Sequence, residues 1–484
     1  MNKYRMAAAA VLACAAPHAA AHGFGQRFDL PLPLWLWVSG AGATIVLTFV
    51  VVALFVRERS VGEGYPRVDL LRIGALAWLA HPAVVALARL LGVLLFVLTV
   101  CAGYFGVQDP YSNLITTMVW IMWWVGLAFV CALVGDLWAL ANPLRTLFAW
   151  AEALYAALSG GRRLSRELPY PAWLAAWPAV LLFLAFSWSE LIWQDNDVPG
   201  YLARALLGYA LHTWAGMFLF GRERWLQQGE AFAVAFGTLA RFAPLDAGRG
   251  RFELRPPGAG LLISRAVHPS YMVFVLLMLS TVTFDGFHET PLMQRVYTVA
   301  QSSPGIASLL FSLSEMGLDE SQLVASAALA VFPLGFIAFY WLASWAMVRV
   351  TRREASVTAA ACSFVLTLVP IAVAYHLSHY FSLLLTAGQF IIPLASDPFG
   401  FGWDLFGTAK YKVDLAIVSP YVFWYGAVLL IVVGHVVAVW LAHVEALRFF
   451  RSREAALKSQ IPMVVLMVAY TTLSLWILAQ PIVG

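Results

Sequence analysis

The stretch "SFVLTLVPIAVAYHLSHYFSLLLTAGQFIIPLA", residues 363–395, contains no Asp, Glu, Lys or Arg. A helix crosses the roughly 30 Å hydrocarbon core of a bilayer with about 20 apolar residues, so this stretch is long enough to span a membrane. We expect the span itself to occupy residues 357–381. It contains two histidines, His376 and His379. Polar side chains are costly inside a bilayer, which makes these histidines the first candidates for a functional site.

The composition of the whole chain favours the same class of protein. Its 484 residues are 62% hydrophobic and 12% charged, whereas a soluble protein has about 25% charged residues. We therefore predict an all-α polytopic membrane protein with about ten transmembrane helices after an N-terminal signal segment. The expected spans lie near residues 34–56, 88–106, 113–135, 171–191, 202–220, 266–285, 321–348, 357–381, 420–441 and 461–481.

Basic residues gather in alternate loops between these spans. Clusters follow the first, third, fifth, seventh and ninth spans, and include Arg57, Arg162, Arg251, Arg352 and Arg451. The positive-inside rule places these loops on the cytoplasmic side of a bacterial inner membrane. Both ends of the mature chain then face the periplasm. Because the basic residues lie in short loops, the sequence gives no indication of nucleic-acid binding.

The N-terminus has the features of a bacterial signal peptide. Residues 1–21 have a basic start, a short apolar core and a small-residue end. Cleavage after Ala21 would leave residues 22–484 as a single transmembrane helical domain, and His22 would offer its amine and its ring to a metal such as copper. Two alternatives stay open, namely a lipoprotein cut before Cys14 and no cut at all. The other cysteines lie in apolar runs and indicate no disulfide framework.

Side chains that bind metals gather at two neighbouring depths. Asp285, His288 and Glu289 follow one another at spacings i, i+3 and i+4, and share a face if the helix continues. His376 lies about 30 Å from the start of its own span, which puts it at the outer boundary of the membrane, with His379 one turn farther. Imidazole and carboxylate groups suit zinc, copper, iron or manganese. The alternative is that these histidines hydrogen-bond to neighbouring helices or face the headgroup region.

Other polar residues in the predicted spans are either further site candidates or structural residues. His212 lies near the middle of the fifth span, where a buried partner is required, and is a further candidate for the site or for a proton path. Interhelical packing is the favoured account of His435 and His443, and helix capping that of Asp136. Two amphipathic helices are expected to lie on the inner surface. They are expected near residues 143–158 and 228–243.

Three segments resemble a known family. They are "HGFGQRFDLPLPLWLWVSGA" at 22–41, "GDLWALANPLRTL" at 135–147 and "QIPMVVLMVAYTTLSLWILAQP" at 460–481. These segments are similar to bacterial integral membrane proteins of the fenitrothion hydrolase family. The resemblance implies a phosphoric triester hydrolase that cleaves a P–O bond of an organophosphate and releases a nitrophenol.

A divalent metal ion, zinc or copper first, would suit this chemistry because it activates water and polarises the phosphoryl group. The predicted ligands are His376, His379, His288 and Asp285, with His22 and His212 as further candidates. Asp285 or Glu289 is the predicted general base, and Tyr380 the predicted donor to the phosphoryl oxygen. The predicted partners are a small apolar substrate from lipid or periplasm, and membrane lipid. The alternatives are a metal-ion or proton-coupled solute transporter, and a membrane subunit that handles copper with a protein partner.

Overall fold

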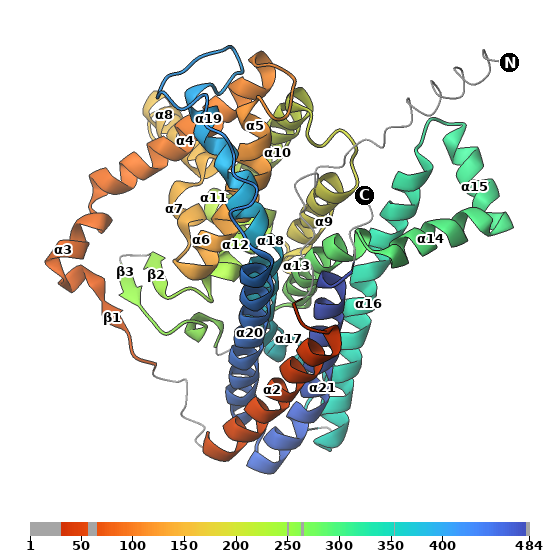
Figure 1. The fold of residues 1–484 in the computed structure, drawn as a ribbon. Coiled ribbons are helices and arrows are strands. Elements are labelled where there is room, and N and C mark those ends of the chain that lie inside the picture. The colour runs from red at the N-terminus through yellow and green to blue at the C-terminus, as the bar shows by residue number, and fades with distance from the viewer. Residues whose placement is uncertain (1–30, 57–64, 249–250, 263–265, 353, 481–484) are drawn as a thin grey trace, which may run out of the picture.

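The computed structural model describes residues 31–56, 65–248, 251–262, 266–352 and 354–480. These residues form a bundle of helices with a single small sheet (Figure 1). Eight helical segments in the described ranges are long and apolar enough to cross a membrane. The chain therefore has the architecture of an all-α, multi-pass membrane protein.

The elements follow one another in a simple order. In the first half they are α2 (Leu34–Phe55), β1 (Val68–Asp69), α3 (Gly74–Ala77), α4 (Pro82–Phe105), α5 (Leu114–Thr116), the π-helix η3 (Thr117–Gly126), α6 (Leu127–Leu133), α7 (Leu137–Ala141), α8 (Pro143–Leu158), α9 (Trp177–Leu191), α10 (Pro199–Phe220), α11 (Arg222–Gln228) and α12 (Ala231–Ala240). In the second half they are β2 (Leu245–Gly248), β3 (Arg251–Leu254), α13 (Pro269–His288), α14 (Pro291–Ser302), α15 (Pro304–Ser314), α16 (Glu320–Val350), α17 (Val357–Phe364), α18 (Val369–Ala387), α19 (Ile391–Ser396), α20 (Pro420–Phe449) and α21 (Arg453–Leu478). The strands form an antiparallel sheet in the order β1-β3-β2.

The structure adjusts three of the predicted spans. The spans expected at 171–191 and 202–220 form helices α9 and α10, which are not among the eight candidates. Helix α9 has only 15 residues, and α10 is long enough, with 22, but less apolar. The span expected at 357–381 is longer. Helical turns continue without a break over Val357–Ser396, 40 residues in all, because short 3₁₀ turns connect α17, α18 and α19.

The helix ends meet on two opposite sides of the bundle. On one side, which we call the basic side, the Arg453 guanidinium donates to the Ala53 carbonyl at the end of α2, at 2.7 Å, and the Leu245 amide donates to the Val134 carbonyl. On the other side, the Val107 amide donates to the Phe399 carbonyl at 2.9 Å, and joins the end of α4 to the chain after α19.

One of the two predicted surface helices is buried instead. Helix α8 forms over the predicted residues 143–158, but α12 lies inside the bundle against α6 and α9. Eight of its ten residues are buried, because α12 is apolar on all sides rather than on one stripe. Glu230, just before α12, accepts a hydrogen bond from Tyr209, midway along α10. Glu230 is therefore buried inside the bundle at the turn between α11 and α12, and we call these two helices the re-entrant pair.

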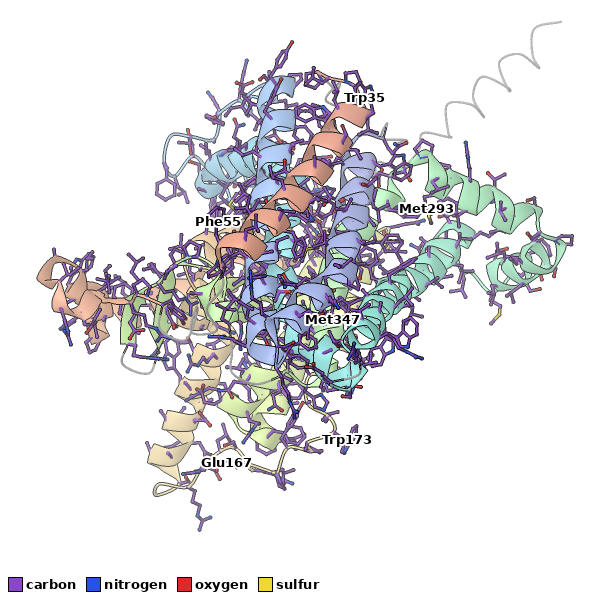
Figure 2. The ribbon with its side chains drawn as sticks, turned by 90° about the horizontal axis from the view of Figure 1, so that it is seen from below. Trp35, Phe55, Glu167, Trp173, Met293 and Met347 are labelled. Atoms are coloured by element: carbon purple, nitrogen blue, oxygen red, sulfur yellow. The ribbon has the colours of Figure 1, made fainter. Side chains whose placement is uncertain are left out.

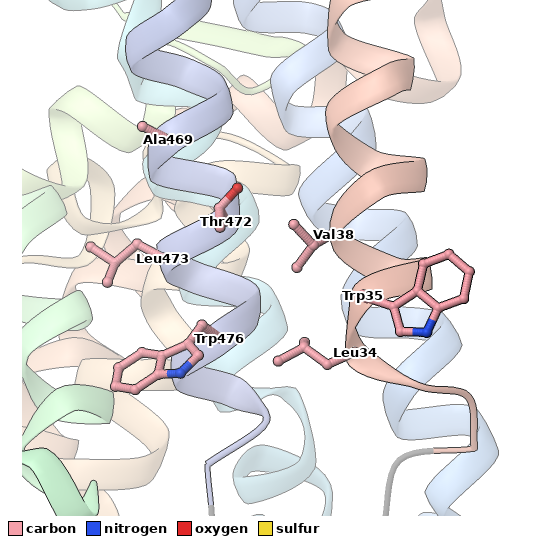
Figure 3. Close-up of a pocket in the computed structure, with 7 residues that line it drawn as sticks. All are labelled: Leu34, Trp35, Val38, Ala469, Thr472, Leu473 and Trp476. Atoms are coloured by element: carbon pink, nitrogen blue, oxygen red, sulfur yellow. The ribbon is translucent and has the colours of Figure 1, made fainter.

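Helix α2 lies along the outside of the bundle, with Trp35 and Phe55 near its two ends (Figure 2). It packs against the last two helices, α20 and α21, where Ala41, Ile431 and Leu475 form a small buried cluster. Between α2 and α21 runs an open, apolar groove of about 630 Å³ (Figure 3). Helices α14 and α15 extend away from the bundle on the side of α16 (Figure 1).

Candidate functional site

Three side chains that the sequence singled out meet between α13 and α18. The Nε2 atom of His379 lies 2.9 Å from Asp285 Oδ2, and the Tyr380 hydroxyl donates to the same oxygen at 2.6 Å. The Asp285 side chain is only 4% exposed, whereas that of His379 is 18% exposed. We call these three residues the Asp–His–Tyr cluster.

Close helix packing holds the cluster in place. Gly286 follows Asp285 on α13, and a Cβ atom at this glycine would meet the Ile477 side chain of α21 at 2.7 Å. The same position lies 3.4 Å from His379 Cε1 and 3.4 Å from the Tyr375 hydroxyl. Only a glycine lets α18 and α21 approach α13 this closely, so Gly286 sets the distance between Asp285 and His379.

The hydrogen bonds explain why a carboxylate is tolerated in this place. Burial of a charge is costly unless charge-assisted hydrogen bonds compensate for it, and Asp285 receives a hydrogen bond from Tyr380 and pairs with His379. A carboxylate in this position fixes the orientation of the imidazole.

The turn of α18 that comes before the cluster carries Tyr375 and His376. The His376 ring lies 4.8 Å from the Tyr380 ring, and 5.7 Å and 5.9 Å from the rings of Trp124 and Phe129. Trp124 lies near the middle of the helical span Leu114–Leu133, and His376 lies in the middle of Val357–Ser396. The prediction that His376 lies at the end of its span is therefore wrong, because the helix continues to Ser396.

The predicted partners His288 and Glu289 face a different neighbour. His288 Nδ1 lies 3.4 Å from Glu289 Oε1, and its Nε2 lies 3.2 Å from the Tyr297 hydroxyl of α14. Helix α13 ends at His288, so the face that Asp285, His288 and Glu289 were expected to share does not continue. Burial, with the charges of Glu289 and Asp319, raises the pKa of Tyr297 to about 12, so this hydroxyl is protonated at neutral pH.

His212 does not join the cluster. Its side chain is exposed on α10, and its ring lies 5.7 Å from that of Trp225. The expectation that His212 has a buried partner is wrong, because α10 packs mainly on α4 and α11 and leaves this position on its outer face. His22 and the predicted signal peptide lie outside the described residues.

The structural predictions for three other polar residues are confirmed. His435 Nε2 lies 2.8 Å from the Thr471 hydroxyl of α21, and His443 Nδ1 lies 3.0 Å from Gln460 Oε1 of the same helix. Both histidines therefore link α20 to α21. Asp136 caps α7 by accepting a hydrogen bond from the Ala139 amide at 2.9 Å.

The cluster provides one carboxylate and one imidazole at close range, with Tyr380 bound to the same oxygen. Nowhere in the described ranges do three or more His, Cys, Asp or Glu side chains gather so that they could hold a metal ion. Of the predicted ligands, Asp285 and His379 meet, whereas His288 lies against Tyr297 of α14.

The sequence analysis missed two side chains beside the cluster, Tyr375 and Trp124. Tyr375 lies four residues before His379, and its ring stacks on the His379 ring at 5.9 Å. The i, i+4 spacing within an apolar helix was a usable signal for Tyr375. No such signal existed for Trp124, because it belongs to the π-helix η3, whose side-chain directions do not follow the α-helical period.

Comparison of the chain with protein-family models, with curated proteins and with solved structures finds no match.

Proposed function

We propose that this protein is a membrane-embedded hydrolase of organophosphate triesters that works through Asp285 and His379. The observation that carries the proposal is the buried hydrogen-bonded pair of these residues, since triester hydrolysis needs a base to activate water. Asp285 lies one turn from the end of α13 that is remote from the basic side. The proposal places the protein in a bacterial inner membrane, with ten spans that include α9 and α10, the basic side in the cytoplasm and both mature ends in the periplasm.

The proposed reaction needs one proton transfer and one displacement. His379 accepts a proton from water while the water oxygen forms a bond to phosphorus. The bond from phosphorus to the nitrophenolate oxygen breaks, and the proton passes from the imidazolium to this leaving group. The products are a phosphoric diester and a nitrophenol. Asp285 stabilises the imidazolium in between, in the way that a carboxylate supports histidine in other hydrolases.

The test is Asp285→Asn in the purified, detergent-solubilised protein. Nitrophenol release from a chromogenic aryl triester is measured by absorbance. We expect kcat to fall by about 10²- to 10⁴-fold, the usual contribution of general acid–base catalysis. The matched control is Asp136→Asn, which alters the capping carboxyl at the start of α7 and should leave turnover unchanged. Wild-type turnover in a folded Asp285→Asn protein would exclude the pair as the catalytic base.

Metal analysis of the same preparation tests the prediction of a bound divalent ion separately. A stoichiometric zinc or copper ion that is lost in His376→Ala and His379→Ala proteins would support it. Turnover that survives complete chelation would count against a role for metal in the reaction.

One observation favours a second candidate, a proton-coupled transporter. The Glu230 carboxylate is fully buried at the turn of the re-entrant pair α11–α12, and ionisable groups inside a membrane often belong to ion pathways. This candidate is tested by pH-dye measurements on proteoliposomes. Proton uptake that is driven by a solute gradient and lost in Glu230→Gln, without any triester hydrolysis in the wild type, would favour transport over hydrolysis.

A further inference from the structure

The proposed hydrolase needs a donor for the phosphoryl oxygen, and the predicted donor is already engaged. Tyr380 was expected to supply this hydrogen bond, but its hydroxyl donates to Asp285 at 2.6 Å. Charge develops on the phosphoryl oxygen during attack by water, and hydrogen-bond donors aimed at such an oxygen give large rate enhancements. Another group beside the cluster is therefore required.

Three polar atoms next to the cluster have no hydrogen-bond partner among the described residues. They are the Tyr375 hydroxyl, His376 Nε2 and Trp124 Nε1. Their side chains belong to residues that are 1%, 6% and 5% exposed. Buried polar atoms are almost always hydrogen-bonded, and an exception in a native structure indicates strain, a functional role or a bound molecule. Two of these atoms belong to α18 and the third to the π-helix η3, which packs against α18.

Two of these atoms lie one helical turn from the catalytic pair. The rings of Tyr375 and His379 are stacked at 5.9 Å with an angle of 16° between them. The rings of His376 and Tyr380 lie 4.8 Å apart. The Tyr375 hydroxyl and His379 Cε1 are each 3.4 Å from the Cβ position of Gly286, so they flank the same point on α13.

The third atom is supplied by an unusual element. Helix η3 is a π-helix of ten residues, whereas π-helices are usually single turns and often mark functional sites. This element packs against α18, and its Trp124 ring meets the His376 ring at 5.7 Å and an angle of 81°. The π-helix is an observation independent of the unpartnered atoms, and it points to the same place.

We propose that Tyr375, His376 and Trp124 form the subsite that binds the phosphoryl oxygen of the triester. An indole N–H is only a donor, a tyrosine hydroxyl donates readily, and His Nε2 donates in one of its tautomers. A ligand that satisfies all three must therefore present an acceptor, which a phosphoryl oxygen does. This assignment rests on the proposed hydrolase function and names the residues that orient its substrate.

The experiment measures binding apart from turnover. Triethyl phosphate has a phosphoryl oxygen but poor leaving groups. A ligand that binds the folded state stabilises it by an amount that grows with the logarithm of the ratio of ligand concentration to Kd, and so raises the unfolding temperature. Titration of the purified protein with triethyl phosphate yields a Kd. Tyr375→Phe and Trp124→Phe each remove one donor and keep the ring. We expect each to weaken binding about threefold to tenfold, the effect of one lost hydrogen bond.

Two control variants define what the result means. Tyr470→Phe removes the hydroxyl of a neighbouring buried tyrosine that is 2.8 Å from the Thr283 hydroxyl, and should leave the Kd unchanged. Asp285→Asn should lower kcat by about 10²- to 10⁴-fold and still bind triethyl phosphate. An unchanged Kd in both Tyr375→Phe and Trp124→Phe, or no stabilisation of the wild type, overturns the subsite even if hydrolysis is observed. Binding that depends on Tyr375 in a protein without triester turnover supports the subsite and rejects the hydrolase.

Discussion

A single hydrogen atom at Gly286 determines how closely three helices approach around the Asp–His–Tyr cluster. Any larger side chain would extend toward Ile477 of α21 and toward His379 and Tyr375 of α18. Protein interiors are packed as densely as organic crystals, so one added methyl group forces neighbouring atoms to move. The geometry of Asp285 and His379 therefore depends on a residue that has no polar side chain.

Gly286→Ala is accordingly expected to destabilise the protein by about 1–3 kcal/mol, the usual cost of overpacking a core. The same change should lower triester turnover, because His379 must shift. Thermal unfolding in detergent provides the first measurement. Gly335→Ala in α16 is the matched control, since its new Cβ would meet nothing within 4 Å and alanine favours a helix by up to about 1 kcal/mol. Equal unfolding temperatures for the two variants would contradict this account.

At the residue scale, the sequence indicated which side chains to examine but not how they pair. The cost of polar groups in a membrane singled out Asp285, His379 and Tyr380, and the structure brings them together. The partner of His288 depended on the position of the next helix. Helix α14 brings the Tyr297 hydroxyl to 3.2 Å from His288 Nε2, and nothing in the spacing of the residues indicated this contact.

At the scale of elements, the re-entrant pair α11–α12 depends on its cap. Glu230 accepts hydrogen bonds from the amides of Phe232 and Ala233, at 2.9 Å and 2.7 Å, and from the Tyr209 hydroxyl. Water cannot replace these bonds because Glu230 is fully buried. The cap of α12 should therefore contribute more to the free energy of unfolding than an exposed helix cap does.

Glu230→Ala should lower the free energy of unfolding by about 2–4 kcal/mol, since it leaves buried amides and a tyrosine hydroxyl without an acceptor. The comparison is Ser356→Ala, which removes the exposed cap of α17, where the Ser356 hydroxyl accepts from the Ala359 amide at 3.1 Å. That change should cost about 0.5–1 kcal/mol. Similar losses in chemical unfolding for both variants would show that burial adds nothing to the cap of α12.

The prediction of helices from sequence failed where the type of a helix, or its burial, depends on the helices packed around it. The interpretation of residues 228–243 as a surface helix assumed that a segment between two spans stays at the membrane surface. The structure instead buries Phe232 and Phe236 among the rings of Trp123 and Trp124. A ten-residue apolar helix looks the same in sequence whether it lies on a surface or inside a bundle.

At the scale of the molecule, the charge pattern predicts which side faces the cytoplasm. Arg162 and Lys410 are exposed and lie in loops of opposite predicted orientation. In intact spheroplasts, a membrane-impermeant maleimide should label Lys410→Cys and spare Arg162→Cys, which reacts only after lysis. The native Cys131 and Cys362 are buried, whereas Cys101 is half-buried, so both variants are made in a Cys101→Ser protein. Labelling of Arg162→Cys in intact cells would reverse the predicted topology.

The overall class of the fold was predictable because membrane helices follow from apolar length and charge alone. The residues at which each helix begins and ends, and the helices it packs against, were not predictable. Helix α9 is only 15 residues long, and helical turns continue from Val357 to Ser396, since packing against other helices decides where each one stops. Nothing in the amino-acid pattern of α2 indicated that its partners are α20 and α21.

The position of α2 has a consequence for synthesis on the ribosome. Its packing partners α20 and α21 begin at Pro420 and Arg453, so about 365 residues are translated between the end of α2 and the start of the first of them. At about 5–20 residues per second, α2 waits roughly 20–70 s in the bilayer before either partner exists. During that interval the apolar face of α2 that later contacts α20 and α21 must be covered by lipid or by the insertion machinery. In stalled or truncated nascent chains this face stays uncovered, so such chains should be recognised by quality-control proteases.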